Sequence, residues 1–576
     1  MTKRPAAHIV LCVIIASVGF AAEKGTGLRD PSPETVTRLA PYKRHIKEIR
    51  LTPLGRERIA RSAAARGIDA AAAGLDAADV FPFGEDLLLS TQSESSLTAT
   101  SEEYPASPWT AWLPTTVDNS TLNAFPPIAN QGGSGSCAAF ATTYYQMTYT
   151  LARQRGWNAK SGGTAYRLSP AWTYNMLNGG SDSGISRDGA LLLGVELGCA
   201  TWAEMPYSAS SYRRWIYNNV AIWKNALNRR MSVCGELRNS STDEGLYQIK
   251  QLINNGHILT FGTYVNSWSR RTIQDDPSTP DDNAFVGQRI CRYVTGRDGA
   301  HAMTIVGYCD VIWCDINGNG SIDTGEQGAL KIANSWGTGD WNGGFRWLAY
   351  DALKDPSSVP GVNDPNRREA FFYDVCWIQA QPPPASPIRG VYTIRHSRRK
   401  EFAMRMAIGS TNDVEPSSSF NFTPNFDGGP FGFDGNSYTA DPASAPEGEF
   451  AVSLDKVHPV AGETRRYFLG MYDRGGTLNP ETGEIRAFHL EDGQGRVLAT
   501  CTNVPIVADG GDSYPYPTAW VWIDYTLPEA TERSVQVSAP LPAASENGPT
   551  SGVFRLSRTG VLTNVCRVFF DISGEA

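Results

Sequence analysis

The chain has 576 residues, of which 41% are hydrophobic and 19% charged, so it is ordinary globular material with room for roughly three or four domains. Its formal net charge of -8 gives no basic surface of the kind that binds nucleic acid, which excludes nucleic-acid binding from the expected functions. Bulk charge does not select any other partner.

The first 22 residues have a basic start, an apolar middle and a small-residue end. Lys3 and Arg4 precede the apolar run 9–20, and two alanines close the stretch at residue 22. This pattern is typical of a secretory signal peptide. The run is shorter than the roughly 20 residues that span a bilayer, and no later stretch is long enough. We therefore expect a signal peptide over residues 1–22, a secreted or extracytoplasmic protein and no membrane span.

Residues 23–112 are rich in Ala, Arg, Glu, Ser and Thr, with a helical pattern from Thr52 to Ala73. A segment between a signal peptide and a domain with a candidate nucleophile suits the pro-region of a zymogen. The alternative is a solvated N-terminal extension with no inhibitory role.

The stretch QGGSGSCAAF, residues 131–140, places a cysteine at the start of a helix. Apolar residues recur at helical spacing from Cys137 as far as Gly156, and Ser136 stands in the N-cap position. A thiol in the first turn lies near unpaired backbone N–H groups and the positive end of the helix dipole, which favour the thiolate. Cys137 is therefore a candidate nucleophile. The alternative is a buried structural cysteine behind a glycine-rich loop.

Residues 113–380 combine helical and strand patterns, as expected of an α+β domain. Its first half is mainly helical, and its second half contains the four strand patterns 257–265, 301–308, 329–336 and 344–350.

Two of these strand patterns carry residues that a thiolate nucleophile needs. His301 begins one, and Asn334 lies near the end of another. Histidine can take the thiol proton near neutral pH and give it to a leaving amine, and an amide can fix the orientation and tautomer of the ring. Gln131 can donate its side-chain N–H to a substrate carbonyl together with the Cys137 backbone N–H. Trp336 can shield the bond between the histidine and the asparagine.

In order and context, Gln131, Cys137, His301 and Asn334 resemble the Gln, Cys, His and Asn of the papain family of cysteine peptidases, and the resemblance covers nearly all of residues 113–380. It implies a papain-like two-lobed fold, with a helical lobe, a β-barrel-like lobe and a peptide substrate in the cleft between them. The substrate-binding residues that it implies are Gly179, Gly180, Ala302 and Trp336.

The chain departs from the family pattern where Ser134 and Leu177 replace two disulfide-forming cysteines, and where Ala138 and Ala300 flank the nucleophile and the histidine. The usual pro-region helix motif is also missing from residues 23–112. The pocket details and the manner of inhibition therefore stay open.

A twelve-residue stretch between the histidine and asparagine strands, DINGNGSIDTGE at 315–326, matches the EF-hand calcium loop. The ligand positions are Asp315, Asn317, Asn319, Ser321, Asp323 and Glu326. Because the flanks are strand-like, we expect a structural calcium loop in a hairpin. Only three ligands are carboxylates, which suggests a Kd of roughly 0.1 to 1 mM. The alternative is an Asn/Gly turn that binds nothing.

The C-terminal third begins at a proline-stiffened linker, QPPPASP, over residues 381–387. Short apolar runs separated by turn residues over 388–540 then predict an all-β sandwich. Residues 541–576 resemble the start of a Calx-beta repeat, which is too short to close a core and suggests a truncated chain. A carbohydrate or surface ligand is one alternative for these β modules, and a spacer role is the other.

Ten cysteines are present. Removing Cys12 in the signal peptide and Cys137 leaves eight, an even number that suits disulfides in an oxidising compartment. Eight cysteines allow about 105 pairings, so the pairing stays open, and we expect only Cys137 to be free.

These observations together predict a secreted cysteine endopeptidase that hydrolyses peptide bonds through a thioester and needs no cofactor for catalysis. Two alternatives stay open. One is transfer of the acyl group to an amine instead of water, and the other is a catalytically inactive binding or adhesion protein.

Overall fold

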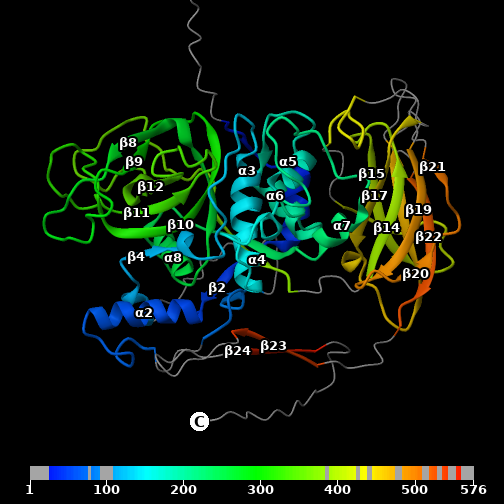
Figure 1. Cartoon of the computed structure of the whole chain (residues 1–576), viewed down its shortest axis with the longest axis horizontal. Coiled ribbons are helices and arrows are strands. Elements are labelled where there is room, and N and C mark those ends of the chain that lie inside the picture. Colours follow the sequence, from blue (N-terminus) through cyan, green and yellow to red (C-terminus); the bar gives the residue numbers. More distant parts are fainter. Residues whose placement is uncertain are drawn as a thin grey trace, which may run out of the picture.

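The computed structural model describes residues 25–75, 80–90, 108–382, 388–422, 428–437, 444–473, 483–508 and 518–528, and the backbone of 535–541 and 553–558. The predicted signal peptide, most of the predicted linker and most of the stretch 541–576 lie outside these residues. Figure 1 shows a sheet-rich lobe, a central helical lobe and a β domain side by side. Within the described residues, no helix is both long and apolar enough to cross a membrane.

The helical lobe is built around one long helix that starts at Cys137. Its consecutive segments are α3 (Cys137–Ala139), η5 (Phe140–Met147) and α4 (Thr148–Arg155), and it ends at Gly156 in a left-handed conformation. The apolar spacing predicts a regular α-helix, but η5 is a π-helix with all of its residues buried. Unlike a surface helix, η5 is contacted on all sides, by two shorter helices and by strands of the sheet-rich lobe, and its π-helical turns are wider than those of an α-helix.

The helical lobe contains three shorter helices, of which the first two pack on the long helix and the third packs on the first through Trp172 and Trp223. They are α5 (Pro170–Leu177), α6 (Arg187–Glu196) and α7 (Val220–Leu227). The first two begin at serine N-caps, where the Ser169 hydroxyl accepts from the Trp172 N–H and the Ser186 hydroxyl from the Gly189 N–H. These caps fix where both helices start.

The sheet-rich lobe contains a nine-stranded sheet in the order β6-β13-β7-β10-β11-β12-β9-β8, with β4 also paired to β10. In chain order the strands are β4 (Thr116–Asp118), β6 (Met231–Leu237), β7 (Leu259–Tyr264), β8 (Trp268–Thr272), β9 (Arg289–Val294), β10 (Ala300–Trp313), β11 (Gln327–Ala333), β12 (Phe345–Ala349) and β13 (Val375–Ala380). Helix α8 (Asp243–Asn254) packs against β10. The four strand patterns of the sequence correspond to β7, β10, β11 and β12.

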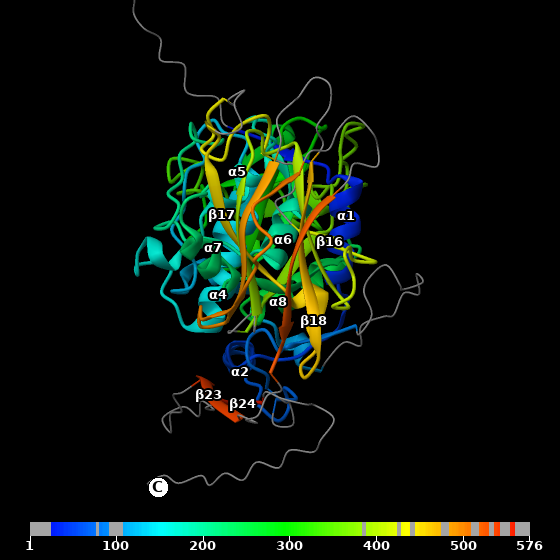
Figure 2. The ribbon, with the colours of Figure 1, turned by 90° about the vertical axis from the view of Figure 1, so that its right-hand side faces the viewer.

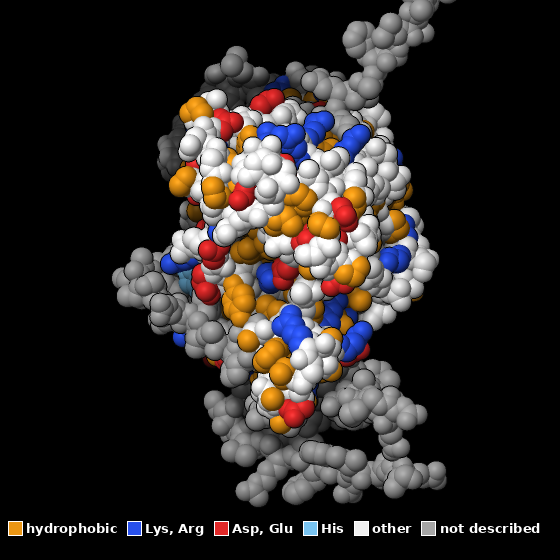
Figure 3. Space-filling view, turned by 90° about the vertical axis from the view of Figure 1, so that its left-hand side faces the viewer, with side chains coloured by type: hydrophobic (Ala, Val, Ile, Leu, Met, Phe, Trp, Pro, Cys, Tyr) orange, Lys and Arg blue, Asp and Glu red, His pale blue; other side chains and the backbone are white. Residues whose placement is uncertain are grey.

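One face of this lobe, seen in Figure 3, carries basic and acidic side chains interspersed with hydrophobic ones. No broad basic patch dominates this view.

The N-terminal extension forms β1 (Leu28–Arg29), α1 (Pro33–Leu39), β2 (Ile46–Ile49), α2 (Pro53–Ala65) and β3 (Leu87–Leu89). Strand β2 pairs with β3, α1 packs on α6, and α2 packs on α8. Helix α2 is shorter than the helical pattern predicts, because the chain turns at Arg66 and at Gly67, which has a positive φ.

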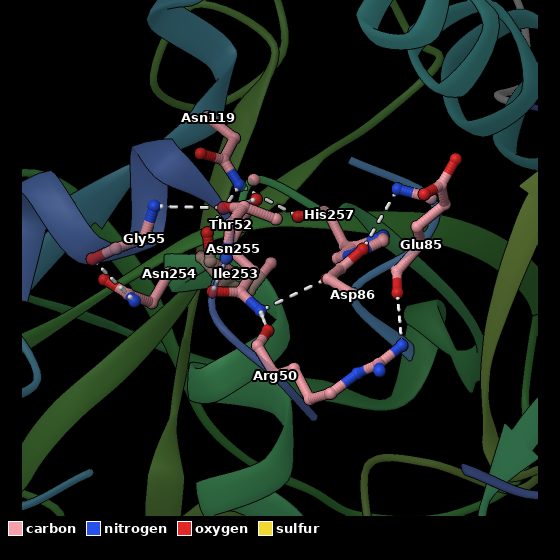
Figure 4. Close-up of polar contacts among 12 residues, drawn as sticks. Arg50, Thr52, Gly55, Glu85, Asp86, Asn119, Ile253, Asn254, Asn255 and His257 are labelled. Carbon is pink, nitrogen blue, oxygen red and sulfur yellow. Dashed lines mark hydrogen bonds and ion pairs between the residues drawn. The ribbon is translucent and has the colours of Figure 1, made fainter. Parts of the chain in front are cut away.

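A buried polar network joins the extension to the sheet-rich lobe (Figure 4). The Asp86 carboxylate accepts hydrogen bonds from Asn255 Nδ2 (3.1 Å) and His257 Nε2 (2.8 Å). The Thr52 hydroxyl donates to the Asn255 carbonyl (3.0 Å) and accepts from the Gly55 N–H. All of these side chains are buried, so the described parts of the extension, 33–75 and 80–90, are integrated into the fold.

The β domain consists of two antiparallel sheets that share a core. One contains β14 (Ile388–Arg395), β17 (Glu447–Ser453), β19 (Gly483–Asp492), β20 (Val497–Thr500) and β21 (Ile506–Ala508); the other contains β15 (Phe402–Gly409), β16 (Phe420–Asn421), β18 (Thr464–Asp473) and β22 (Thr518–Thr526). Figure 2 shows this domain from outside. Its β17 packs on α7, with Trp223 against Phe450 at 4.9 Å between ring centroids.

The last described residues form a two-stranded antiparallel sheet of β23 (Val535–Leu541) and β24 (Val553–Arg558). Two strands are too little to identify a Calx-beta repeat, which is not shown. The ligand of the β domain stays a prediction.

All eight cysteines in the described residues are free and buried, so the expected disulfides are not found there. They lie in several core clusters, and the Cys199 thiol, for example, donates to the Ala200 carbonyl at 3.2 Å. A free cysteine packs in a core as a small hydrophobic residue. An even number of cysteines in the sequence therefore does not by itself indicate disulfide bonds.

Candidate active site

Cys137 is the first residue of α3 and is completely buried. Its sulfur accepts from the backbone N–H groups of Ala138 and of Ala302 on β10, the residue after His301. The nucleophile candidate therefore lies where the helical lobe meets the sheet-rich lobe. Ser136 stands before the helix as predicted, but its hydroxyl bonds to the Tyr207 hydroxyl (2.8 Å) rather than capping the helix.

His301, at the start of β10, bonds through Nε2 to Asn334 Oδ1 at 2.8 Å. Antiparallel pairing of β10 with β11 brings the two residues together, because Asn334 follows directly after β11. An amide oxygen only accepts, so Nε2 carries the proton and Nδ1 is the basic nitrogen. Nδ1 is buried and has no hydrogen-bond partner among the described residues. The Trp336 ring covers the imidazole, with the ring centroids 4.8 Å apart.

Gln131 is held rigidly beside the same site. Its Oε1 accepts from the Ser335 hydroxyl (2.5 Å), and its backbone N–H donates to the Ser335 carbonyl (2.8 Å). Its Nε2 donates to the Ser134 carbonyl (2.7 Å) and to the Gly25 carbonyl (3.2 Å). The side chain is thus aimed so that its N–H can hold a carbonyl oxygen.

Both members of the candidate nucleophile and base pair are neutral in this conformation. Burial raises the pKa of the Cys137 thiol to about 11, and the surrounding backbone N–H groups offset only part of this. Burial also lowers the pKa of His301 to about 4. The sequence-based expectation of a thiolate is therefore wrong for this state, since desolvation outweighs the helix dipole.

The N-terminal segment 25–30, here called the strap, covers this pair. In Figure 1 the blue start of the described chain enters between the sheet-rich lobe and α3. The Gly27 N–H donates to the Ala300 carbonyl (3.1 Å), and the Ile185 N–H donates to the Gly27 carbonyl (3.0 Å). The Gly25 carbonyl accepts from Trp336 Nε1 (3.1 Å) as well as from Gln131.

Strand β1 of the strap pairs in parallel with β5 (Ile185–Ser186), and Leu28 packs in the same apolar cluster as Cys137 and Ala302. The strap backbone packs directly against the backbone of residues 133–135. A Cβ atom at Gly25 would overlap the Ser134 carbonyl, and one at Gly27 would overlap Gly135. Glycine is therefore required at both strap positions.

The remaining predicted substrate-binding residues lie in two places. Ala302 and Trp336 contact the strap. Gly179 and Gly180 instead pack against residues 428–431 of the β domain. The glycine that borders the strap is Gly184, where a Cβ would overlap the Gly27 carbonyl. Sequence analysis did not single out Gly184, although a glycine two residues before the helix N-cap Ser186 indicates a turn.

The predicted calcium loop is a tight turn in which the expected ligand residues hydrogen-bond to one another. Asp323 Oδ2 accepts from the side-chain amides of Asn317 and Asn319, both at 2.7 Å. Rotating these amides would present their oxygens to a shared cation, so Asn317, Asn319 and Asp323 fit a calcium site. Glu326 fits poorly, because its carboxylate accepts from the Trp313 Nε1 and from three backbone N–H groups.

Over the described ranges, no three His, Cys, Asp or Glu side chains are gathered closely enough to hold a metal ion. Calcium binding therefore stays a prediction. Calcium at tenfold its Kd should stabilise the chain by about 1.4 kcal/mol relative to a chelator, measured as a higher melting temperature. Asp323→Ala should remove the difference. Equal melting of the parent with calcium and with chelator would contradict the prediction.

The chain matches no family model and no curated protein. Among solved structures it is similar to xylellain, a cysteine protease from Xylella fastidiosa, at 18% identity over 47% of this chain and 88% of that one (TM-score 0.31). It is also similar to the proform of Amb a 11, a cysteine protease and major ragweed pollen allergen (18%, 47% and 68%, 0.30), and to a recombinant stem bromelain precursor (14%, 47% and 72%, 0.31). All three TM-scores are below 0.5, so the function is inferred from the site geometry.

Proposed function

We propose that the protein is a secreted cysteine endopeptidase. The Cys137 sulfur attacks the scissile carbonyl carbon, and His301 takes the thiol proton at Nδ1 and gives it to the leaving amine. Asn334 holds the ring, and Gln131 Nε2 with the Cys137 N–H stabilises the oxyanion. Water then hydrolyses the thioester, with His301 as the base.

One observation carries this proposal. The His301 ring is bonded to Asn334 through Nε2, and its basic Nδ1 is buried without a partner among the described residues. His301 lies on β10 directly before Ala302, whose N–H donates to the Cys137 sulfur. A structural histidine in a core normally uses both nitrogens. The signal-peptide pattern of residues 1–22 supports secretion.

The proposal includes a latent state. The Gly25 carbonyl occupies the Gln131 donor, and the Gly27 N–H contacts the Cys137 sulfur. While the strap is in place a substrate carbonyl cannot reach either group. In this proposal the strap, and not the whole extension, inhibits the enzyme.

Labelling with a thiol-directed epoxide tests the proposed nucleophile. In the Gly25→Leu/Gly27→Leu background, where the strap is displaced, we expect intact mass spectrometry to find one adduct, mapped to Cys137. The buried-cysteine control Cys199→Ala in that background should carry the same adduct, and Cys137→Ala should carry none. Peptide hydrolysis should be lost in the same variant. Absence of an adduct even after the strap is displaced would favour an inactive binding protein, and aminolysis products with added amine would favour acyl transfer.

A further inference from the structure

Asn334 has a second partner that the catalytic roles above do not use. Its Nδ2 donates to Asp340 Oδ2 at 2.8 Å, and the Asp340 carboxylate is completely buried. The same carboxylate accepts from Arg346 through Nε at 2.8 Å and Nη2 at 2.9 Å. Arg346, Asp340, Asn334 and His301 thus form one continuous buried chain of hydrogen bonds.

This chain determines which end of the Asn334 amide faces the imidazole. The oxygen and nitrogen ends have nearly the same shape, so sterics alone do not choose between them. A carboxylate only accepts hydrogen bonds, so Asp340 attracts the amide nitrogen and the oxygen turns to His301. The Ser335 N–H donates to Asn334 Oδ1 at 2.8 Å, which favours the same orientation of the amide.

The orientation matters because it sets the tautomer of the ring. With the amide oxygen toward Nε2, that nitrogen keeps its proton and Nδ1 is free to accept one. With the amide nitrogen toward Nε2, the proton would move to Nδ1, and the ring could not accept the thiol proton. The wrong amide orientation would therefore leave the site assembled but inactive.

Arg346 in turn fixes the carboxylate. Its side chain is buried, and its guanidinium carbon lies 4.8 Å from the Trp336 ring centroid and 4.3 Å from that of Trp341. Trp336 is the ring that covers His301. Arg346 therefore supports both the acceptor for Asn334 and the cover over the imidazole.

We propose that Asp340 is a positioning residue that sets the amide orientation of Asn334 and thereby the tautomer of His301, and that Arg346 holds Asp340 in place. The catalytic consequence rests on the proposed peptidase function, whereas the tautomer is a property of the folded chain alone.

The test combines a single variant with a swap. Asp340→Asn places an amide against both Asn334 and Arg346. The double variant Asn334→Asp/Asp340→Asn moves the carboxylate to residue 334, where it accepts from His301 and from the new amide, and it keeps the net charge. Nitrogen-15 NMR of histidine-labelled full-length chain reports the His301 tautomer without requiring activity.

We expect the parent to show the Nε2–H tautomer, Asp340→Asn to shift toward Nδ1–H, and the swap to restore Nε2–H. With the strap displaced, kcat of Asp340→Asn should fall about 10- to 100-fold with little change in KM, and the swap should recover most of that loss. An unchanged tautomer and kcat in Asp340→Asn, or a swap no better than the single variant, would overturn the proposal.

A matched control separates positioning from stability. Arg367 Nη2 and Asp351 Oδ2 form another buried pair at 2.6 Å in the same lobe. Asp351→Asn should lower the melting temperature comparably and leave the His301 tautomer and kcat unchanged; a matching tautomer shift there would make the effect of Asp340 merely structural and refute the positioning role. If the tautomers behave as expected but no variant hydrolyses peptides, the proposed function fails and the positioning role stands.

Discussion

Gly25→Leu/Gly27→Leu should raise the rate of Cys137 alkylation by iodoacetamide at neutral pH by at least about 100-fold, and should start peptide hydrolysis. Side chains at these positions overlap the Ser134 carbonyl and Gly135, so the strap cannot keep its position against residues 134–135. Water then returns to the two buried groups. The measurement is the pseudo-first-order alkylation rate, followed by intact mass.

The size of the effect follows from the pKa values. With the thiol pKa near 11, only about one chain in ten thousand holds a thiolate at pH 7, and a return toward the ordinary value of about 8.5 raises that fraction by about 300-fold. The His301 pKa, now about 4, should rise toward its ordinary value, so that the ring can hold the thiol proton. In the parent, alkylation should accelerate mainly at high pH, since only the thiolate reacts.

Glu34→Leu is the matched control, because it adds a leucine to the N-terminal extension just after the strap, at an exposed position on α1. It should alkylate at the parent rate. A strap variant that stays as slow as the parent, although folded, would show that residues 25–30 do not inhibit.

His301→Ala should lower kcat/KM by roughly 10⁴- to 10⁶-fold in the strap-displaced protein, since removal of the base leaves only binding and oxyanion stabilisation. The loss should appear in kcat, because His301 contacts the reacting proton rather than the substrate side chains. The measurement is steady-state hydrolysis of a fluorogenic peptide.

His257→Ala provides the comparison, because His257 is also a buried histidine of the sheet-rich lobe and bonds to Asp86 rather than to a residue of the proposed site. It should lower the melting temperature and leave kcat/KM unchanged. A His301→Ala variant that retained the parent kcat would exclude the proposed mechanism.

The sequence predicted the parts of the site that depend on residue type and order. Gln131, Cys137, His301 and Asn334 were proposed from their chemistry and context. Pairing of β10 with β11 brings His301 to Asn334, the Ser335 hydroxyl bonds to Gln131, and the Ala302 N–H bonds to Cys137. The strands that carry them were also visible as apolar runs. These features are local, so the chain order preserves them.

The features that sequence analysis missed depend on contacts between distant segments. The strap looked like ordinary extension, since nothing in its composition shows that Gly25 meets Gln131, 106 positions later. Cys137 is likewise buried by residues distant in the chain, among them Leu28 and Ala302, and this burial raises its pKa where the helix start favoured a lower one. Asp340 was an unremarked acid in a Gly/Trp-rich turn, and its role becomes visible only beside Arg346.

The network of Figure 4 has a consequence for maturation. Asp86 and Thr52 are tied to Asn255 and His257, so excising the whole extension would strip hydrogen bonds from the interior of the sheet-rich lobe. A single cut behind the strap avoids that loss. The mature enzyme would then keep almost the full mass of its precursor. Activation would be recognised by a new N-terminus, detected by sequencing rather than by a gel shift.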